Sequence, residues 1–352
     1  MTETHEAVEP GALCRSFRLR NYVDGRVVVP EDFTLDTGPV PEPAPGTVLA
    51  KTLAMSVDPV LRGSMTGVKT FYHPQFQLNE PVHSRGVGRV VRSEHPDYRV
   101  GDLVTGRFAW ADYSVMSPET AFRAGTDLRP AMPSDVKITH HLGLLSSSGE
   151  TAYYGMVFVS KIRAGDTVVV SGAAGAVGSL AGQIARILGA GKVIGLAGTD
   201  EKCEVLTSQL GFDAAINYRE PDLASRLEQE IPEGHTIYFD NVGGAVSQAV
   251  MNAMPVGGRV VECGQISTYD DAGGGWMVDI RPIHAKRLEF VGFARYHFSE
   301  FAPSATAQLA AWSKAGALKA LETQWHGLEA LPGAFIGMLA GANTGKMVVV
   351  LE

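Results

Sequence analysis

A glycine-rich stretch near the middle of the chain constrains the fold more than any other feature. Residues 168–178 read Val-Val-Val-Ser-Gly-Ala-Ala-Gly-Ala-Val-Gly, so a run of β-branched residues leads directly into three glycines. The overlapping residues 177–188 carry small and apolar side chains and predict a helix. A buried strand, a tight glycine turn and a helix in this order are typical of one βα unit in a parallel sheet.

Strand and helix patterns alternate after this turn. Short apolar runs predict strands, and the more polar segments between them predict helices. The expected strands are 167–171, 192–197, 214–217, 236–240, 259–263 and 288–292, and the expected helices are 177–188, 200–210, 223–230, 245–254 and 304–315. Unbroken apolar strands separated by helices indicate a parallel sheet covered on both faces, which is the doubly wound α/β (Rossmann) fold.

The residues before this alternation have a different character. Strand-like runs at 47–53, 86–92 and 102–107 are separated by turn residues, chiefly proline and glycine. Several short strands with glycine turns indicate a compact, barrel-like β-rich domain.

The end of the chain indicates how the two parts are connected. Residues 345–351 form a strand pattern with no helix after it, and the simplest placement returns this strand to the first domain. We therefore expect a β-rich domain built from 1–145 and 318–352, with the α/β domain, 146–317, inserted between its two parts. A length of 352 residues is compatible with two or three domains.

Composition excludes several classes of protein. The formal net charge of −8 argues against a nucleic-acid partner, which needs a basic face. No apolar run reaches the ~20 residues that span a bilayer, and the polar first ten residues lack a signal-peptide core, so we expect a cytoplasmic protein. The three cysteines, Cys14, Cys203 and Cys263, lie too far apart to indicate a disulfide scaffold or a four-cysteine zinc lobe.

The glycine turn has the chemistry of a pyrophosphate site. A helix N-terminus offers unpaired N–H groups and the positive end of the helix dipole, while Gly175 lets the backbone approach a phosphate and Gly178 lets the helix pack on the strand. Ala174 stands near the place of a glycine in the usual Gly-x-Gly-x-x-Gly spacing, and Ala176 and Val177 complete the turn. The alternative is a tight turn that binds nothing.

The end of the second expected strand bears on the type of dinucleotide. Enzymes that use NAD place an acidic residue here to bind the ribose 2′-hydroxyl. This chain has Gly198, which leaves room, and Lys202, whose charge suits a 2′-phosphate, so the pattern favours NADPH. Asp200 and Glu201 argue the other way, and in the alternative interpretation Asp200 caps a helix on which Lys202 is solvated.

Motifs along nearly the whole chain resemble those of one superfamily. They are Met-Ser-Val-Asp-Pro at 55–59, Leu-Arg-Gly at 61–63, Gly-Glu-Thr-Ala-Tyr-Tyr-Gly at 149–155, the glycine turn at 171–178, Gly-Thr-Asp-Glu-Lys at 198–202, Leu-Gly-Phe-Asp at 210–213, Phe-Asp-Asn-Val-Gly-Gly at 239–244, Cys-Gly-Gln-Ile-Ser-Thr-Tyr at 263–269 and Asn-Thr-Gly-Lys at 343–346. In this order they resemble the medium-chain dehydrogenase/reductase superfamily. Within it, the chain is most similar to the zinc-independent leukotriene B4 12-hydroxydehydrogenase/prostaglandin reductase group, with its alkenal double-bond reductases and curcumin reductases.

The resemblance implies a GroES-like first domain and a reaction. NADPH would reduce the carbon–carbon double bond of an α,β-unsaturated aldehyde or ketone, and the enzyme would be a homodimer. The cofactor-binding residues implied in addition to 174–178 are Thr151, Gly198, Thr199, Lys202, Tyr218, Asn241, Cys263, Gly264, Ile266, Ser267, Phe293, Arg295 and Asn343. Lys202 and Tyr218 would contact the 2′-phosphate region, Thr151 would lie by the nicotinamide, and Asn343 would reach the cofactor from the last segment. Turn chemistry before a glycine is the alternative role for Asn241 and Asn343.

Tyr269 is the residue expected nearest the chemistry. Hydride transfer to the β-carbon leaves charge on the carbonyl oxygen, and a hydroxyl donor stabilises that enolate. The alternative is a tyrosine that anchors its loop through the ring.

The chain departs from the resembled pattern at two positions that bear on the substrate. Val60 stands where the group has a tyrosine, and Ala285 stands where a second tyrosine is expected, so the substrate stays open. The cysteine of the zinc-containing members is absent from 55–59, and His140 and His141 are adjacent rather than spaced for one helix face, so no metal is expected. A quinone reductase, or a non-catalytic NADPH-binding sensor, are the alternative functions.

Overall fold

A computed structural model describes residues 8–9, 11–68, 75–118, 128–131, 135–231, 236–271 and 275–351. The chain forms two compact units, which we call the β-rich unit and the α/β unit. The β-rich unit comprises Met1–Leu142, Thr323–Ala342 and Met347–Glu352, and the α/β unit comprises Gly143–Glu322 and Asn343–Lys346. The chain passes between the two units at residues 142/143 and 322/323, and these domain boundaries were expected from the sequence at 145/146 and 317/318.

Antiparallel sheets form the β-rich unit. Strands β1 (Leu13–Leu19) and β2 (Phe33–Pro39) pair with each other, and a seven-stranded sheet has the order β14-β15-β3-β4-β5-β7, with β6 also paired to β3. The bounds of the sheet strands are β3 Val48–Ser56, β4 His83–Ser93, β5 Leu103–Ala109, β6 Tyr113–Met116, β7 Leu128–Pro130, β14 Glu322–His326 and β15 Lys346–Val350. The last strand pairs antiparallel with β3, so the predicted return of the chain to its first part is confirmed.

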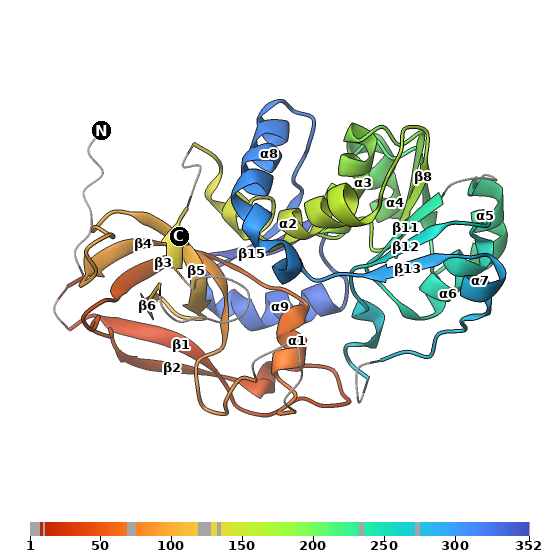
Figure 1. Ribbon diagram of the computed structural model, residues 1–352. Helices are drawn as coiled ribbons and strands as arrows, with labels where there is room; N and C mark the ends of the chain where they lie inside the picture. The colour runs from red at the N-terminus through yellow and green to blue at the C-terminus, as the bar shows by residue number, and fades with distance from the viewer. Residues whose placement is uncertain are drawn as a thin grey trace. The chain divides into compact units, whose positions relative to one another are not determined.

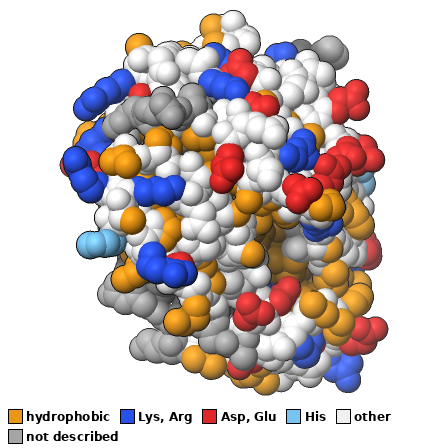
Figure 2. Space-filling view, turned by 90° about the vertical axis from the view of Figure 1, so that its right-hand side faces the viewer, with side chains coloured by type: hydrophobic (Ala, Val, Ile, Leu, Met, Phe, Trp, Pro, Cys, Tyr) orange, Lys and Arg blue, Asp and Glu red, His pale blue; other side chains and the backbone are white. Residues whose placement is uncertain are grey.

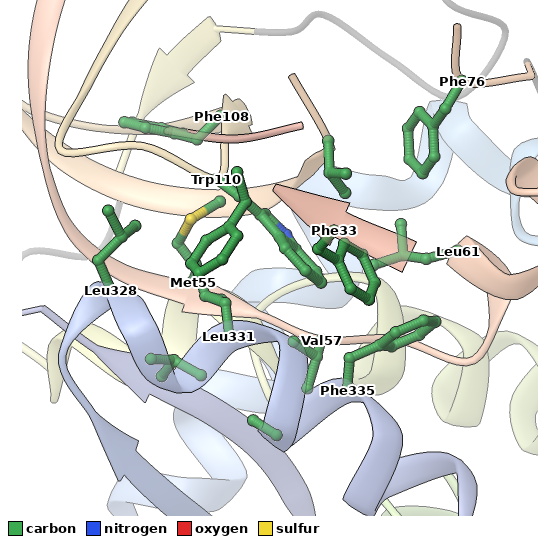
Figure 3. Close-up of a cluster of buried hydrophobic side chains, with 14 of the residues drawn as sticks. Phe33, Met55, Val57, Leu61, Phe76, Phe108, Trp110, Leu328, Leu331 and Phe335 are labelled. Atoms are coloured by element: carbon green, nitrogen blue, oxygen red, sulfur yellow. The ribbon is translucent and has the colours of Figure 1, made fainter. Parts of the chain in front are cut away.

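The core of the β-rich unit is built around Trp110 (Figure 3). The indole is fully buried, stacks on Phe33 with ring centroids 5.5 Å apart, and donates from Nε1 to Ser84 Oγ at 2.9 Å. Phe335 of helix α9 (Leu331–Leu339) meets the indole edge-on at 6.0 Å. The short helix α1 (Val60–Ser64) adds Leu61 to the same cluster. A buried tryptophan whose N–H is satisfied contributes its whole apolar area to stability without a polar penalty.

Six parallel strands form the sheet of the α/β unit (Figure 1). Their order is β10-β9-β8-β11-β12-β13, so the strand order reverses between β8 and β11, the switch point at which open α/β sheets bind ligands. The bounds are β8 Thr167–Val170, β9 Lys192–Ala197, β10 Ala214–Asn217, β11 Thr236–Asp240, β12 Arg259–Glu262 and β13 Glu289–Gly292. The predicted doubly wound fold is therefore confirmed.

Helices cover both faces of this sheet. The helix bounds are α2 Ser147–Tyr154, α3 Gly178–Ile187, α4 Asp200–Gln209, α5 Leu223–Glu230, α6 Gly244–Ala253, α7 Arg281–Ala285 and α8 Ala302–Lys314. Leu227 of α5 and Met251 of α6 are buried in one cluster with Val169 of β8. Figure 1 shows α3 on the opposite side of the sheet from α6.

The surface carries charges of both signs. The face in Figure 2 shows basic and acidic side chains among hydrophobic ones, in a chain with 30 Lys and Arg against 38 Asp and Glu. Among the described residues, no helix is long and apolar enough to cross a membrane.

Candidate functional site

The glycine turn after β8 has room for backbone only at Gly178. Gly172 has a φ of +55°, and the Gly175 N–H donates to the Gly172 carbonyl at 2.9 Å. A Cβ on Gly178 would lie 2.4 Å from the Gly172 oxygen and 2.8 Å from Ala173 Cα, closer than atoms pack. These contacts explain why the sequence has glycine at the start of α3.

The first turn of α3 is open to an anion. Val177 is the N-cap and its side chain makes no capping hydrogen bond, while the Ser179 N–H donates to the Gly175 carbonyl at 3.1 Å. Because the helix dipole is positive here and the turn of Ala174, Gly175 and Ala176 carries no bulky side chain, the geometry suits a phosphate.

The segment containing Asn343 lies against the same turn. The Gly345 N–H donates to the Ala174 carbonyl at 2.7 Å, and Gly345 forms a parallel bridge with Gly175. Asn343 Nδ2 donates to the Gly345 carbonyl at 2.7 Å. The structure therefore brings Asn343 to the glycine turn. The hydrogen bond from its Nδ2 to the Gly345 carbonyl is a local turn contact, which is the alternative role given to Asn343 above.

The second candidate cluster surrounds Gly198, directly after β9. A Cβ on Gly198 would lie 3.0 Å from Tyr218 Oη and 3.4 Å from Arg219 Nε, so these two side chains line the space above the glycine. Lys202 is half-buried, and its pKa is lowered by burial and then by the charge of Arg219. Thus Gly198, Lys202 and Tyr218 come together, and Arg219, which the sequence did not indicate, joins them.

The two neighbouring acids are engaged elsewhere. Asp200 Oδ1 accepts from Asn217 Nδ2 at 2.9 Å. The pKa of Glu201 is lowered by its own backbone N–H and by the Thr199 hydroxyl. Thr199, not Asp200, is the N-cap of α4, and its Oγ1 accepts from the Lys202 N–H at 3.3 Å. The alternative in which Asp200 caps the helix is therefore wrong.

A buried carboxylate organises the end of β11. Asp240 is fully buried and accepts hydrogen bonds from Ser171 Oγ at 2.9 Å and Tyr238 Oη at 2.8 Å, and also from Ser247 Oγ. The backbone N–H groups of Val242 and Gly243 also donate to this carboxylate, at 3.0 and 3.1 Å. A carboxylate with this many donors fixes the loop between β11 and α6.

The loops after β8, β11 and β12 are hydrogen-bonded into one group. Asn241 donates from its backbone N–H to Ser171 Oγ at 2.9 Å and from Nδ2 to the Ser171 carbonyl at 2.7 Å. Cys263 and Gly264 donate their N–H groups to the Asp240 carbonyl at 2.8 and 3.1 Å. Three strand ends are therefore held together at the carboxyl edge of the sheet.

The rest of the loop after β12 is held to the loop after β11 in the same way. The Ile266 N–H donates to the Asn241 carbonyl at 3.3 Å, and Ser267 Oγ donates to the Val242 carbonyl at 2.6 Å. Burial, and then the charge of Glu262, raises the pKa of the Cys263 thiol, which is neutral as a result.

Tyr269 folds back over its own loop. Its Oη lies 3.7 Å from the position of a Cβ on Gly264, and burial, followed by the neighbouring Cys263, raises the pKa of its hydroxyl. The protonated hydroxyl thus lies beside Gly264 and Cys263, two of the predicted cofactor-binding residues. This placement is compatible with both roles given to Tyr269 above.

Glu262 is a second, half-buried carboxyl group in this region. It ends β12 opposite Asp240 in the parallel register. Burial, and then the charge of Asp240, raises the pKa of Glu262 to about 8, so this carboxyl group is protonated at neutral pH.

Another group of predicted residues lies where α2 meets the segment after β13. Phe293, just after β13, meets Phe239 of β11 edge-to-face at 6.4 Å. Arg295 Nη1 donates to Glu150 Oε2 at 2.6 Å, and Glu150 is fully buried on α2. Thr151 follows Glu150 on that helix and is half-buried. The ion pair therefore ties Arg295 to the helix that carries Thr151.

Sequence reasoning missed Arg219, Glu150 and Glu262. Arg219 directly follows Tyr218, and this adjacency was its one sequence signal; both side chains border the space at Gly198 in the structure. The partners Glu150 and Arg295, in contrast, are separated by 145 positions, and no local pattern connects them.

Comparison with known proteins adds to this geometry. Residues 15–124 match the family model described as the N-terminal domain of oxidoreductase, and residues 176–311 match the model described as zinc-binding dehydrogenase. YfmJ of Bacillus subtilis is 42% identical over 330 residues, which are 92% of this chain and 94% of YfmJ. The NADP(+)-dependent 2-alkenal reductase of Nicotiana tabacum is 36% identical over 95% of this chain and 96% of its own.

The chain belongs to the medium-chain dehydrogenase/reductase superfamily. Its group is that of the alkenal and curcumin reductases. The structure of CurA from Vibrio vulnificus in complex with NADPH superposes with a TM-score of 0.85 at 33% identity, covering 96% of this chain and 99% of CurA.

The name of the second family model mentions zinc. Among the residues that the structure describes, no three His, Cys, Asp or Glu side chains are grouped so that they could hold a metal ion.

Proposed function

We propose that this protein, an NADP-dependent oxidoreductase, uses NADPH to reduce the carbon–carbon double bond of α,β-unsaturated aldehydes or ketones. The observation that carries the proposal is the pair of anion sites at one edge of the α/β sheet. One is the glycine turn before α3, where a Cβ on Gly178 would lie 2.4 Å from backbone oxygen. The other is the cationic space above Gly198, lined by Tyr218 and flanked by Lys202. A dinucleotide with a 2′-phosphate needs both.

Each predicted residue has a proposed task in this function. The turn 174–178 holds the pyrophosphate through N–H groups other than that of Gly175, which donates to the Gly172 carbonyl. Gly198, Thr199, Lys202 and Tyr218 hold the phosphorylated ribose. Asn343 reaches the cofactor from the last segment, beside the glycine turn. The nicotinamide half is bound by residues of the strand-end loops and their neighbours, namely Thr151, Asn241, Cys263, Gly264, Ile266, Ser267, Phe293 and Arg295.

The reaction follows from the electronics of an enone. NADPH supplies a hydride, which adds to the β-carbon while the π electrons shift to the carbonyl oxygen. Tyr269, with its hydroxyl protonated, donates a hydrogen bond to that oxygen as negative charge develops on it, and a proton from solvent then adds to the α-carbon and restores the carbonyl group. The raised pKa of Tyr269 supports the role, because its hydroxyl stays a donor at neutral and mildly basic pH.

We further propose that the reaction needs no zinc and that the protein is a homodimer. Hydride transfer from a nicotinamide needs no metal when a hydroxyl stabilises the enolate. Strand β13 lies at an edge of the six-stranded sheet, and Phe290 on it is 38% exposed, which suits pairing with a second copy.

The test is NADPH consumption at about 340 nm, the nicotinamide absorbance, with a panel of enals, enones and quinones, and with NADH in parallel. Oxidation of NADPH by enals or enones, with a saturated carbonyl product, supports the proposal. Activity with quinones alone replaces it with a quinone reductase, and tight binding of NADPH with no turnover replaces it with a sensor.

A further inference from the structure

We propose that Glu262 is a positioning residue for the cofactor site. In its protonated form it hydrogen-bonds Asp240 and keeps the loops after β11 and β12 in the arrangement that binds the nicotinamide half, and loss of its proton weakens NADPH binding. This inference rests on the proposed function and deepens it, because it adds control by pH at that same site. The motifs that indicated the cofactor do not include Glu262.

Glu262 and Asp240 end two neighbouring parallel strands. The register places Glu262 of β12 directly opposite Asp240 of β11, so the two side chains lie on the same face of the sheet. Asp240 is fully buried, and Glu262 Oε2 is shielded from solvent without a hydrogen-bond partner among the described residues. Two ionised carboxylates repel each other in such a place, and one proton between them removes the repulsion. Burial, and then Asp240, raises the pKa of Glu262 to about 8, so Glu262 carries this proton at neutral pH.

Asp240 holds the loop after β11 through its side chain and the loop after β12 through its backbone. Its Oδ1 accepts from the N–H groups of Val242 and Gly243 at 3.0 and 3.1 Å. Its carbonyl accepts from the N–H groups of Cys263 and Gly264 at 2.8 and 3.1 Å. A displacement of Asp240 therefore moves both loops.

The same pair of carboxyl groups is connected to two further residues of the proposed site. The Glu262 carbonyl accepts from the Phe293 N–H at 3.3 Å. The Asn241 N–H donates to Ser171 Oγ, which itself donates to Asp240 at 2.9 Å. Phe293 and Asn241 are both proposed above to bind the nicotinamide half. A second negative charge beside Asp240 therefore acts on this half of the site.

Glu262 changes its charge between about pH 7 and pH 9, while three titratable neighbours stay neutral. Tyr238 of β11 donates to Asp240, and burial, followed by the charge of Asp240, raises its pKa well above the usual value. In the loop after β12, burial raises the pKa of the Cys263 thiol and of the Tyr269 hydroxyl, and the charge of Glu262 adds to both effects. The ionisation of Glu262 is therefore the change to expect at this pair of strand ends.

The experiment measures the dissociation constant of NADPH at about pH 7 and pH 9 by titration calorimetry in the full-length protein. If only the protonated form of Glu262 supports binding, the constant follows the ionised fraction and rises about 10-fold at one unit above a pKa of about 8. Glu262→Gln keeps a donor and cannot ionise, so its constant should rise less than about 3-fold. Glu262→Leu is a second neutral variant with the same expected result.

Two controls accompany these variants. Glu228→Gln removes an exposed carboxylate from α5 and should retain the wild-type rise. The fragment 2′,5′-ADP carries the phosphorylated adenosine half without the nicotinamide, so any pH dependence of its binding should be equal in wild type and Glu262→Gln. The melting temperature of each variant at neutral pH checks that it is folded.

Three outcomes overturn the assignment. An NADPH affinity of the wild type that does not change with pH, or one that falls by the same factor in both neutral variants, removes Glu262 from the control of binding. A difference between wild type and Glu262→Gln that is as large for 2′,5′-ADP as for NADPH shows that the charge does not act on the nicotinamide half. In each case enone reduction by the wild type at neutral pH would leave the proposed function standing, whereas a wild-type protein that does not bind NADPH would end both.

Discussion

Replacing Glu262 by Gln should make the protein lose less stability as the pH rises from about 5 to 8. Glu262 lies opposite the fully buried Asp240 on the neighbouring strand, and burial followed by the charge of Asp240 raises its pKa from 4.5 to about 8. A protonated Glu262 can donate toward Asp240, and Gln has the same shape and can donate in the same way. Above pH 8, in contrast, the wild-type protein must hold two carboxylates side by side.

The magnitude follows from linkage. Between pH 4.5 and about 8 the folded state keeps the proton on Glu262 and the unfolded state releases it, so stability falls as pH rises through this window. Each unit of difference between the pKa values in the folded and unfolded states changes the free energy of unfolding by about 1.4 kcal/mol. Because solvent reaches part of this side chain and screens its charge, we expect the wild-type protein to lose about 2–3 kcal/mol relative to Glu262→Gln between pH 5 and pH 8.

Urea unfolding of both proteins, followed by circular dichroism at several pH values from about 5 to 8, measures this difference. Titrations of other groups cancel when the variant is subtracted from the wild type. Glu228→Gln, which removes an exposed carboxylate from α5, is the matched control. A free-energy difference between wild type and Glu262→Gln that stays constant over the pH range would refute the reasoning.

Three further predictions concern the site. Gly178→Ala should abolish measurable NADPH binding and lower the free energy of unfolding by about 2 kcal/mol, because the added Cβ would overlap the Gly172 carbonyl. An unchanged NADPH affinity in calorimetry would show that the glycine turn is not part of the cofactor site. Tyr269→Phe should lower kcat about 100-fold at unchanged NADPH affinity, and full activity in steady-state kinetics would leave Tyr269 only its ring-anchoring role. Glu150→Met and Arg295→Met should each cost about 3–5 kcal/mol, since each removes one partner of an ion pair between a fully buried carboxylate and a half-buried guanidinium, and the double variant should recover most of that loss. A loss in the double variant equal to the sum of the two single losses in urea unfolding would contradict this pairing.

The sequence predicted the elements of the α/β unit well because each carries its signal locally. The apolar runs of β9, β10 and β11 and the helix α5 have the expected bounds, and the glycine turn needs only its neighbours in sequence to be recognised. The β-rich unit was predicted less fully. Strand β2 is mostly exposed and shows no regular alternation.

Helix α9 was missed for a different reason. It contains Gly333 and Gly337, which disfavour a helix, but a Cβ on Gly333 would lie 3.2 Å from the Trp325 ring, so tertiary packing requires the small residue. The site shows the same limit. Residues that follow one another in a motif were predicted, whereas the approach of Arg219 to Gly198 and the pair formed by Glu150 and Arg295 depend on which strands and helices become neighbours.

The most direct test of the central claim is to follow the hydride itself. NADPH deuterated at both C4 positions is incubated with the protein and an enone, and the product is analysed by NMR and mass spectrometry. The proposed reaction predicts a saturated ketone with one deuterium at the β-carbon and solvent hydrogen at the α-carbon. Deuterium at the carbonyl carbon of an unsaturated alcohol would contradict it, because the protein would then reduce the carbonyl group and not the double bond.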